Sequence, residues 1–227
     1  MNWVKKHLVG CSRRAVKDTD KAQKRQDLLS VAGRLLLTQD FASLSMDDVA
    51  AASNVAKGTL YLYFKTKEEL ALGVLARDTA EWLDALTAYL QQPGTLAPAN
   101  YVAWFCQSLR DRPRYVTFIP ISVTILEKNI SKEAAREFKL LIAAQLEKLA
   151  PLLQLRLGFT SPDRAARFLM QSHGLIMGLY PCCNPCPIVQ EIIVEEKLDL
   201  FRQDFYETLA DSLLTLLRGY QQETVSA

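Results

Sequence analysis

The chain has 227 residues, 49% of them hydrophobic, which is enough for one or two folded domains with a sizeable core. Its nine Phe, eight Tyr and three Trp argue against disorder, and no apolar run approaches the ~20 residues that would span a bilayer. The formal net charge is only +2. Five cysteines fit poorly with a fully paired disulfide framework and suit a reducing compartment, so we expect a cytoplasmic protein without a membrane segment.

The N-terminal end of the chain is the basic end. Residues 1–67 hold twelve Lys and Arg against six Asp and Glu, which leaves fifteen basic and nineteen acidic residues for the rest. Such a basic end suits contact with phosphates, while an ordinary solvated surface with a basic tail is the alternative. Residues 1–20 show no periodicity, so we expect a basic arm that is disordered or that reaches DNA.

The first predicted helix runs from Lys21 to Thr38, where apolar residues recur at helical spacing. Residues 45–64 then predict two short helices broken by a tight turn. Ser45 is a suitable N-cap for the first of them, with two aspartates in its first turn, where the helix dipole favours negative charge. The second carries a lysine and two phenols on one side, which suits insertion into a DNA major groove.

The remaining chain is also predicted to be helical. Thr66 caps a long helix that runs to about Gln92, and Pro93-Gly94 stops it. Further helices are predicted at 98–111, 113–128, 131–157, 162–180 and 198–219. Pro120 should bend or break the second of these. We therefore predict an all-α fold of about nine helices.

The region around the second short helix resembles the N-terminal domain of the tetracycline-repressor (TetR) family. The resemblance covers about residues 22–70 and rests on Gly-Thr-Leu-Tyr-x-Tyr-Phe-Lys-x-Lys at 58–67. It implies a three-helix DNA-binding domain with a helix-turn-helix motif, followed by a helical domain that dimerises and holds an effector. We place these domains at 21–67 and 68–227, after the basic arm 1–20.

Three side chains of the second short helix are candidates for reading bases. Lys57 and Tyr61 are expected at base edges, where a lysine favours guanine O6 or N7. Leu62 is placed to touch a thymine methyl group. The family resemblance implies contacts at the same positions.

Five further residues are candidates for the DNA backbone. Thr59, Tyr63 and Lys67 are expected at phosphates, which set register without reading sequence. Gly58 lets the backbone approach the groove closely. Ser45 opens a helix N-terminus that could hold a phosphate.

Two C-terminal segments have broad apolar faces. Residues 198–220 carry a stripe that includes Phe205, Leu209 and Leu213, and residues 162–180 carry a similar one. Two such helices from each protomer would form a four-helix homodimer interface, whereas packing within one chain is the alternative. A dimer suits DNA, because two recognition helices must meet successive major grooves about 34 Å apart.

An effector site is expected among the middle helices, where a few polar groups on an apolar wall would give the usual composition of a ligand pocket. The candidate lining residues are Trp104, Phe105, Phe118, Ile121, Phe138, His173 and Met177. Most aromatic and aliphatic residues at helical spacing are plain core, so these assignments depend on which faces turn inward.

Cys182, Cys183 and Cys186 fall within five residues of a proline-rich segment. They predict a rigid loop with small apolar fillers, a thiol sensor, or a metal site completed by His173. The spacing matches no standard zinc site, and no metal or other cofactor is predicted.

An enzyme is not expected, because the chain has two histidines and neither Gly-x-Ser-x-Gly nor His-Glu-x-x-His. The sequence therefore predicts a sequence-specific DNA-binding transcriptional regulator. We expect a homodimeric repressor that a small-molecule effector releases from a palindromic double-stranded operator. A thiol- or metal-responsive regulator acting through the cysteine loop is the alternative.

Overall fold

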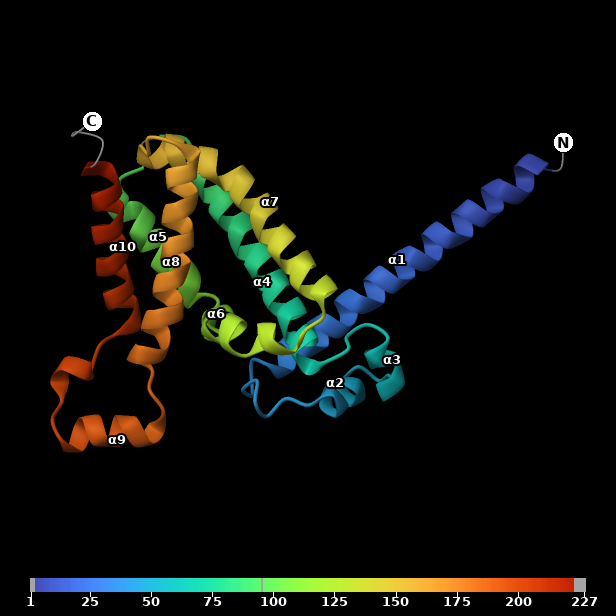
Figure 1. The fold of residues 1–227 in the computed structure, drawn as a ribbon, viewed down its shortest axis with the longest axis horizontal. Helices are drawn as coiled ribbons and strands as arrows, with labels where there is room; N and C mark the ends of the chain where they lie inside the picture. The colour runs from blue at the N-terminus through green and yellow to red at the C-terminus, as the bar shows by residue number, and fades with distance from the viewer. Residues whose placement is uncertain (1–2, 95, 223–227) are drawn as a thin grey trace. The chain divides into compact units, whose positions relative to one another are not determined.

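The computed structural model describes residues 3–94 and 96–222, and every regular element within them is helical (Figure 1). These elements are α1 (Trp3–Leu35), α2 (Met46–Ala52), α3 (Lys57–Tyr61), α4 (Lys67–Leu90), α5 (Pro98–Arg110), α6 (Pro113–Thr124), η1 (Leu126–Asn129), α7 (Lys132–Leu157), α8 (Pro162–Cys183), α9 (Pro187–Glu195), η2 (Asp199–Phe201) and α10 (Phe205–Gln222). The predicted all-α fold is confirmed. Among the described helices, none combines the length and the apolar composition that crossing a bilayer would need.

The chain divides into two compact units. The first comprises Met1–Val74 with Asn129–Ser131, and the second comprises Leu75–Lys128 with Lys132–Ala227. The first turns of α4 belong to the first unit because Leu70, Ala71 and Val74 are fully buried there. The sequence places the boundary at residue 67, ahead of these buried residues.

Helix α1 starts far earlier than the sequence predicts. It begins at Trp3, so residues 3–20 are helical where a loose arm was expected, while residues 1–2 lie outside the described residues. Extending an existing helix needs no new nucleation, and no proline occurs before Pro93. A polar segment without an apolar face can therefore continue the helix, and contact of this segment with DNA stays a prediction.

The first unit is held together by a small apolar core. Leu28 and Ala32 of α1 meet Val49 of α2, Leu60 of α3 and the following Phe64, and each is at most 1% exposed. Helix α4 packs closely on this core, since a Cβ added to its Gly73 would lie 2.8 Å from Leu29 Cδ2. Large-to-small changes in such cores typically cost about 2–5 kcal/mol.

In the second unit α8 is central, because it packs against α6, α7 and α10. Figure 1 shows α8 and α10 running side by side. Phe205, Leu209, Leu213 and Leu217 of α10 are buried within the single chain. This part of the stripe predicted as a dimer interface packs within the chain, as the alternative expected.

The stretch between α8 and α10 differs from the sequence prediction. Helix α8 continues through Pro181 to Cys183, and α9 begins at Pro187, which occupies the first helical position where proline is well tolerated. The last helix begins at Phe205 rather than at residue 198. Figure 1 shows α9 beyond the ends of α8 and α10.

Candidate functional site

The surface around α3 gathers most residues predicted to contact DNA. Helix α3 is fixed from behind by Leu60, which is fully buried, and by Phe64. On the other side Tyr61 is 44% exposed and Leu62 is 76% exposed. Four predicted residues (Lys57, Gly58, Tyr61 and Leu62) are thus exposed, and two (Thr59 and Tyr63) are half-buried. We call these six the α3 surface.

The cation of the α3 surface has an acidic partner. Lys57 Nζ lies 2.7 Å from Asp47 Oδ1 on the preceding helix. The hydrogen bond with Asp47 raises the pKa of Lys57. Because both side chains are mostly exposed, this ion pair adds little stability. It holds the lysine in one place and offsets part of its charge.

The side chain of Ser45 is committed to capping α2. Its hydroxyl accepts a hydrogen bond from the backbone N–H of Asp48 and lies 2.6 Å from the Asp48 carboxylate, which also accepts from the Ser45 backbone N–H. This reciprocal pair is a capping box. A carboxylate already lies at the helix N-terminus, so the phosphate site predicted at Ser45 is disfavoured by charge.

Lys67 is also committed within the first unit. Its ammonium donates to the carbonyl oxygens of Phe41, Ala42 and Leu44 at 3.1 to 3.2 Å, and it lies 4.7 Å from the centre of the Phe41 ring. An ammonium has three protons, and three carbonyls take them. Lys67 thus braces the loop before α2, and its phosphate contact stays a prediction.

Residues 129–131 brace the start of α4. The Thr66 hydroxyl donates to the Asn129 carbonyl at 2.8 Å, and the Asn129 amide donates to Glu68 at 2.9 Å. The Glu69 carboxylate accepts from the backbone N–H groups of Lys65 and Ser131, both at 2.8 Å. Burial opposes the charge on Glu69, but these hydrogen bonds outweigh it and lower the pKa. We call this set the α4 brace.

The α4 brace joins groups more than 60 residues apart in sequence, and no local pattern predicts it. A buried glutamate at the start of a helix is the one available signal. Such a carboxylate needs partners, and first-turn backbone N–H groups supply only some of them.

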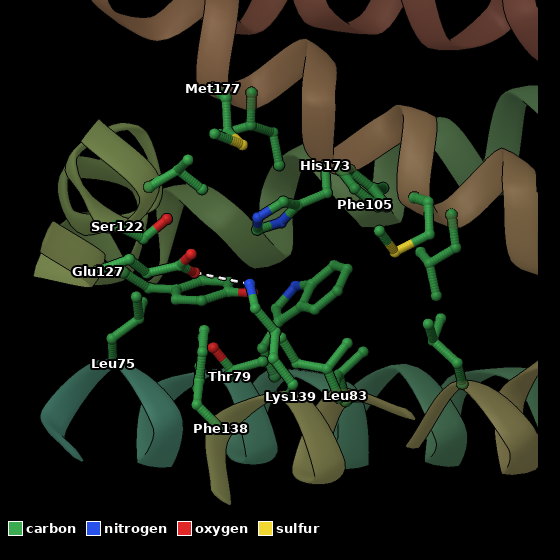
Figure 2. A pocket seen from close by; sticks show the side chains of 18 residues that line it. Leu75, Thr79, Leu83, Phe105, Ser122, Glu127, Phe138, Lys139, His173 and Met177 are labelled. Atoms are coloured by element: carbon green, nitrogen blue, oxygen red, sulfur yellow. Dashed lines mark hydrogen bonds and ion pairs between the residues drawn. The ribbon is translucent and has the colours of Figure 1, made fainter. Parts of the chain in front are cut away.

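A cavity of about 190 Å³ lies in the second unit, among α4, α5, α6, η1, α7 and α8 (Figure 2). Its lining is mostly apolar. The lining residues are Leu75, Thr79, Trp82, Leu83, Phe105, Tyr115, Ser122, Val123, Glu127, Phe138, Lys139, Ile142, Leu146, Leu169, Met170, His173, Ile176 and Met177.

Four of the seven predicted effector-site residues line this cavity: Phe105, Phe138, His173 and Met177. The other three, Trp104, Phe118 and Ile121, do not. Trp104 stacks on Tyr89 with ring centres 4.5 Å apart, because its position one residue before Phe105 turns it to another side of α5. Phe118 is buried away from the cavity. Sequence spacing alone does not fix which face of each helix turns inward.

The polar groups of the cavity converge on one place. Lys139 Nζ lies 2.6 Å from Glu127 Oε1, and Figure 2 shows the His173 imidazole pointing into the cavity toward this pair. Burial and the nearby Lys139 lower the pKa of His173, so the imidazole is neutral. The sequence prediction missed Glu127 and Lys139. The available signal was the position of Lys139, which lies on the same, otherwise apolar face of α7 as Ile142 and Leu146.

The cysteine segment does not assemble a metal site. Within residues 3–94 and 96–222, no three His, Cys, Asp or Glu side chains come together in a way that could hold an ion. His173 lines the cavity, and Cys182 and Cys186 are exposed. Burial raises the pKa of the Cys183 thiol, which reduces its thiolate fraction.

Two family models match consecutive parts of the chain. The model described as bacterial regulatory proteins, tetR family, matches residues 28–74. The model described as the tetracyclin repressor-like C-terminal domain matches residues 76–224. The two matches meet where the chain divides into its two compact units.

Two named relatives match part of the chain. The chain is 40% identical over 48 residues to the HTH-type transcriptional regulator EthR of Mycolicibacterium smegmatis, which covers 21% of this chain and 22% of that regulator. It is 28% identical over 85 residues to the HTH-type transcriptional repressor NemR of Escherichia coli K12, which covers 37% of this chain and 43% of that repressor. The chain thus spans less than half the length of either relative.

Solved structures share the fold across most of the chain. A possible TetR family transcriptional regulator from Streptomyces coelicolor A3(2) aligns at a TM-score of 0.58 and 19% identity, over 87% of this chain and 98% of that one. The TetR family repressor AlkX from Dietzia sp. aligns at 0.53 and 18%, over 87% and 95%. Together with the two family matches, this architecture shows that the chain belongs to the tetracycline-repressor family of bacterial regulatory proteins.

Proposed function

We propose that the protein is a transcriptional repressor that binds double-stranded operator DNA through the α3 surface. The observation that carries this proposal is a short helix fixed by a buried core on one side and bearing Lys57, Tyr61 and Leu62 exposed on the other. Such a helix can present its side chains to the base edges of a major groove. The similarity to EthR and NemR, both named as HTH-type transcriptional regulators, supports this assignment.

We propose that two copies pair through the outer faces of α8 and α10. Their inner faces are used within the chain, but a shallow and largely apolar groove remains on the outside. It is lined by Gln171, Gly174, Leu175, Asp211, Ser212, Thr215 and Leu216. Small residues such as Gly174 and Ser212 permit close helix approach, and a twofold pair of such faces would give a four-helix interface. A twofold dimer requires a palindromic operator.

We propose that a small-molecule effector occupies the 190 Å³ cavity and weakens operator binding. Glu127 of the cavity precedes the α4 brace by only two residues, since η1 ends at Asn129. A ligand that changes the position of Glu127 would therefore act on the segment that supports the start of α4. It shifts the equilibrium only if it binds the two states with different affinity.

Selection from a random duplex library by the purified full chain tests the DNA-binding proposal. The expected result is enrichment of a palindrome whose binding weakens steeply with salt, because phosphate contacts release counterions. Lys57→Ala should cost ~1–3 kcal/mol on the selected site if the lysine reads a base. The absence of any enriched duplex would overturn the proposal.

A further inference from the structure

Most polar groups around the cavity already have partners. The Trp82 indole N–H donates to Ser108 at 2.9 Å, and the Ser122 hydroxyl donates to the Ile119 carbonyl at 2.7 Å. Thr79 and Tyr115 are hydrogen-bonded to each other. An incoming ligand therefore meets apolar walls and one polar place, which Glu127, Lys139 and His173 form.

The three groups at that place carry unequal charge. Glu127 offers one carboxylate, while Lys139 offers an ammonium and His173 an imidazole that makes no hydrogen bond within the described part of the chain. The carboxylate and the ammonium pair with each other at 2.6 Å. The imidazole keeps a donor and an acceptor without a partner among the described side chains, and it points toward the pair (Figure 2).

Charge balance separates the ligand classes that could bind there. The Lys139 ammonium, and not the Glu127 carboxylate, is the charge that acts on His173, so it would repel a cationic ligand bound beside the imidazole. An anionic ligand could pair with Lys139 and also accept a hydrogen bond from His173. Because buried charges are tolerated only when they are paired and hydrogen-bonded, the second arrangement costs less.

We propose that the effector is a small, largely apolar carboxylic acid whose carboxylate takes the place of Glu127 on Lys139 and accepts a hydrogen bond from His173. This inference rests on the proposed effector function of the cavity. The exchange substitutes one carboxylate for another, so the ammonium never loses a partner. The side chains allow it, since Lys139 is 58% exposed and Glu127 is 25% exposed, and both can move toward solvent.

The size of the cavity limits the apolar part of the acid. An apolar cavity of ~150 Å³ holds a benzene molecule. A volume of about 190 Å³ therefore suits one or two fused rings, or an alkyl chain of similar bulk. Rings from Trp82, Phe105 and Phe138 line the walls and offer edge and face contacts to an aromatic acid.

The same exchange gives the ligand a route to regulation. Once displaced, Glu127 no longer fixes η1 to α7 through Lys139. The next residues, Asn129 and Ser131, hold Thr66, Glu68 and Glu69 in the α4 brace. An acid that releases Glu127 thus loosens the segment that supports α4, whereas a neutral analogue that leaves the ion pair intact does not.

Calorimetric titration of the full chain with matched probes tests the proposal. The probes are 2-naphthoate, 2-naphthamide and 2-naphthylmethylammonium, which share one ring system and differ in charge, together with octanoate. We expect at least one of the acids to bind and the amide and ammonium probes to bind at least tenfold more weakly than 2-naphthoate. Equal or tighter binding of the amide or the ammonium probe, or failure of both acids, would overturn the proposal.

Variants of Lys139 and Glu127 sharpen the test. Lys139→Met should weaken acid binding at least tenfold and leave amide binding unchanged, which also reports that the variant is folded. Lys148→Met, at an exposed lysine of the same helix outside the cavity, is the matched control and should change neither. Glu127→Gln removes the competing carboxylate and should tighten acid binding. Unchanged acid affinity in Lys139→Met would contradict the inference.

DNA binding is measured separately on the same samples without ligand. If the protein binds duplex DNA but neither acid, the proposed regulatory function stands and this inference is wrong. If the protein binds an acid through Lys139 but no duplex, the ligand assignment stands and the proposed DNA-binding function is wrong.

Discussion

The charge of the α3 surface depends on Lys57 and on its acidic partner Asp47 in the preceding helix. The carboxylate holds the lysine at 2.7 Å and cancels part of its attraction for DNA. Asp47→Asn should free the lysine and remove one negative charge from this surface. We expect tighter binding to all duplexes and a salt dependence steeper by about one phosphate contact.

Fluorescence anisotropy over a range of salt concentrations measures this change. Asp199→Asn, at an exposed aspartate of the second unit, serves as the charge-matched control and should leave DNA binding unaltered. A parallel loss of affinity in Asp47→Asn would show that Asp47 positions the lysine for contact rather than restraining it.

Lys67 illustrates how a basic residue of the first unit can serve the fold itself. Its three protons serve three carbonyls, so Lys67→Met should leave those half-buried acceptors without a partner. We expect a loss of ~1–3 kcal/mol in the free energy of unfolding of the first unit. Urea denaturation compares this variant with Lys65→Met, an exposed neighbour that should change little. Unchanged stability with a shallower salt dependence of DNA binding would restore the phosphate role.

His173 makes acid binding depend on pH. In the free protein, burial and Lys139 lower its pKa; Glu127 and Tyr115 are the other titratable groups that line the cavity with it. A bound carboxylate would raise that pKa, so binding takes up a proton. Affinity for 2-naphthoate should therefore rise as pH falls from 8 toward 6, near the ordinary histidine pKa of about 6.5.

His173→Gln checks the cause of this dependence, because glutamine keeps an N–H donor but does not titrate. The variant should still bind the acid, with a flat profile over the same pH range. A profile as steep as that of the unaltered protein would place the titrating group elsewhere.

At the scale of whole elements, the α4 brace ties the start of α4 to residues 129–131. Glu69 accepts from the backbone of Lys65 and Ser131 at once, and Glu69→Gln cannot accept both bonds in the same way. We expect a loss of ~1–3 kcal/mol in stability of the first unit and weaker repression by effector-free protein. Glu68→Gln, which keeps an acceptor for Asn129, should have a smaller effect.

Lowering the pH should remove the same stabilising contribution of Glu69. Since the pKa of Glu69 is lowered in the folded protein, its stabilising effect is complete above the unfolded glutamate value of about 4.3. It is lost as pH falls through the folded pKa. Thermal unfolding of Glu69→Gln should therefore differ most from that of the unaltered protein at neutral pH and converge with it in acid.

The sequence predicts helix starts well where the signal is local. Ser45 caps α2, and Pro98, Pro113 and Pro162 begin helices as their positions indicate. Helix α9 is missed because Pro187 lies in a proline-rich run that also fits a loop. The orientation of α7 depends on packing between segments distant in sequence, so the position of Lys139 on an apolar face indicates an inward lysine but does not identify Glu127 as its partner.

For the whole molecule, the two apolar stripes predicted to pair copies of the chain are partly used within the chain. The inner part is core, and the outer groove of α8 and α10 is the face that we propose for a partner. Leu175→Glu with Leu216→Glu should convert a dimer to a monomer, because four charges would meet across the twofold interface. Leu155→Glu, at an exposed leucine of α7 outside the groove, should stay dimeric.

Analytical ultracentrifugation distinguishes these variants. The operator affinity of the double variant should fall toward the affinity of a monomer for a single half-site. A double variant that remains dimeric would show that the interface lies elsewhere.

The all-α fold and the helix-turn-helix were predictable because periodicity and a short motif specify them. Pairing surfaces were not, because intrachain and interchain packing use the same apolar patterns.

The most direct measurement is salt-dependent anisotropy of a library-selected duplex with the unaltered chain and the Lys57→Ala variant. We expect a palindrome whose half-site centres lie about one helical turn, or a multiple of it, apart. Binding should weaken steeply as salt rises, and the variant should lose ~1–3 kcal/mol of binding free energy. Binding that ignores both duplex sequence and salt concentration would contradict it.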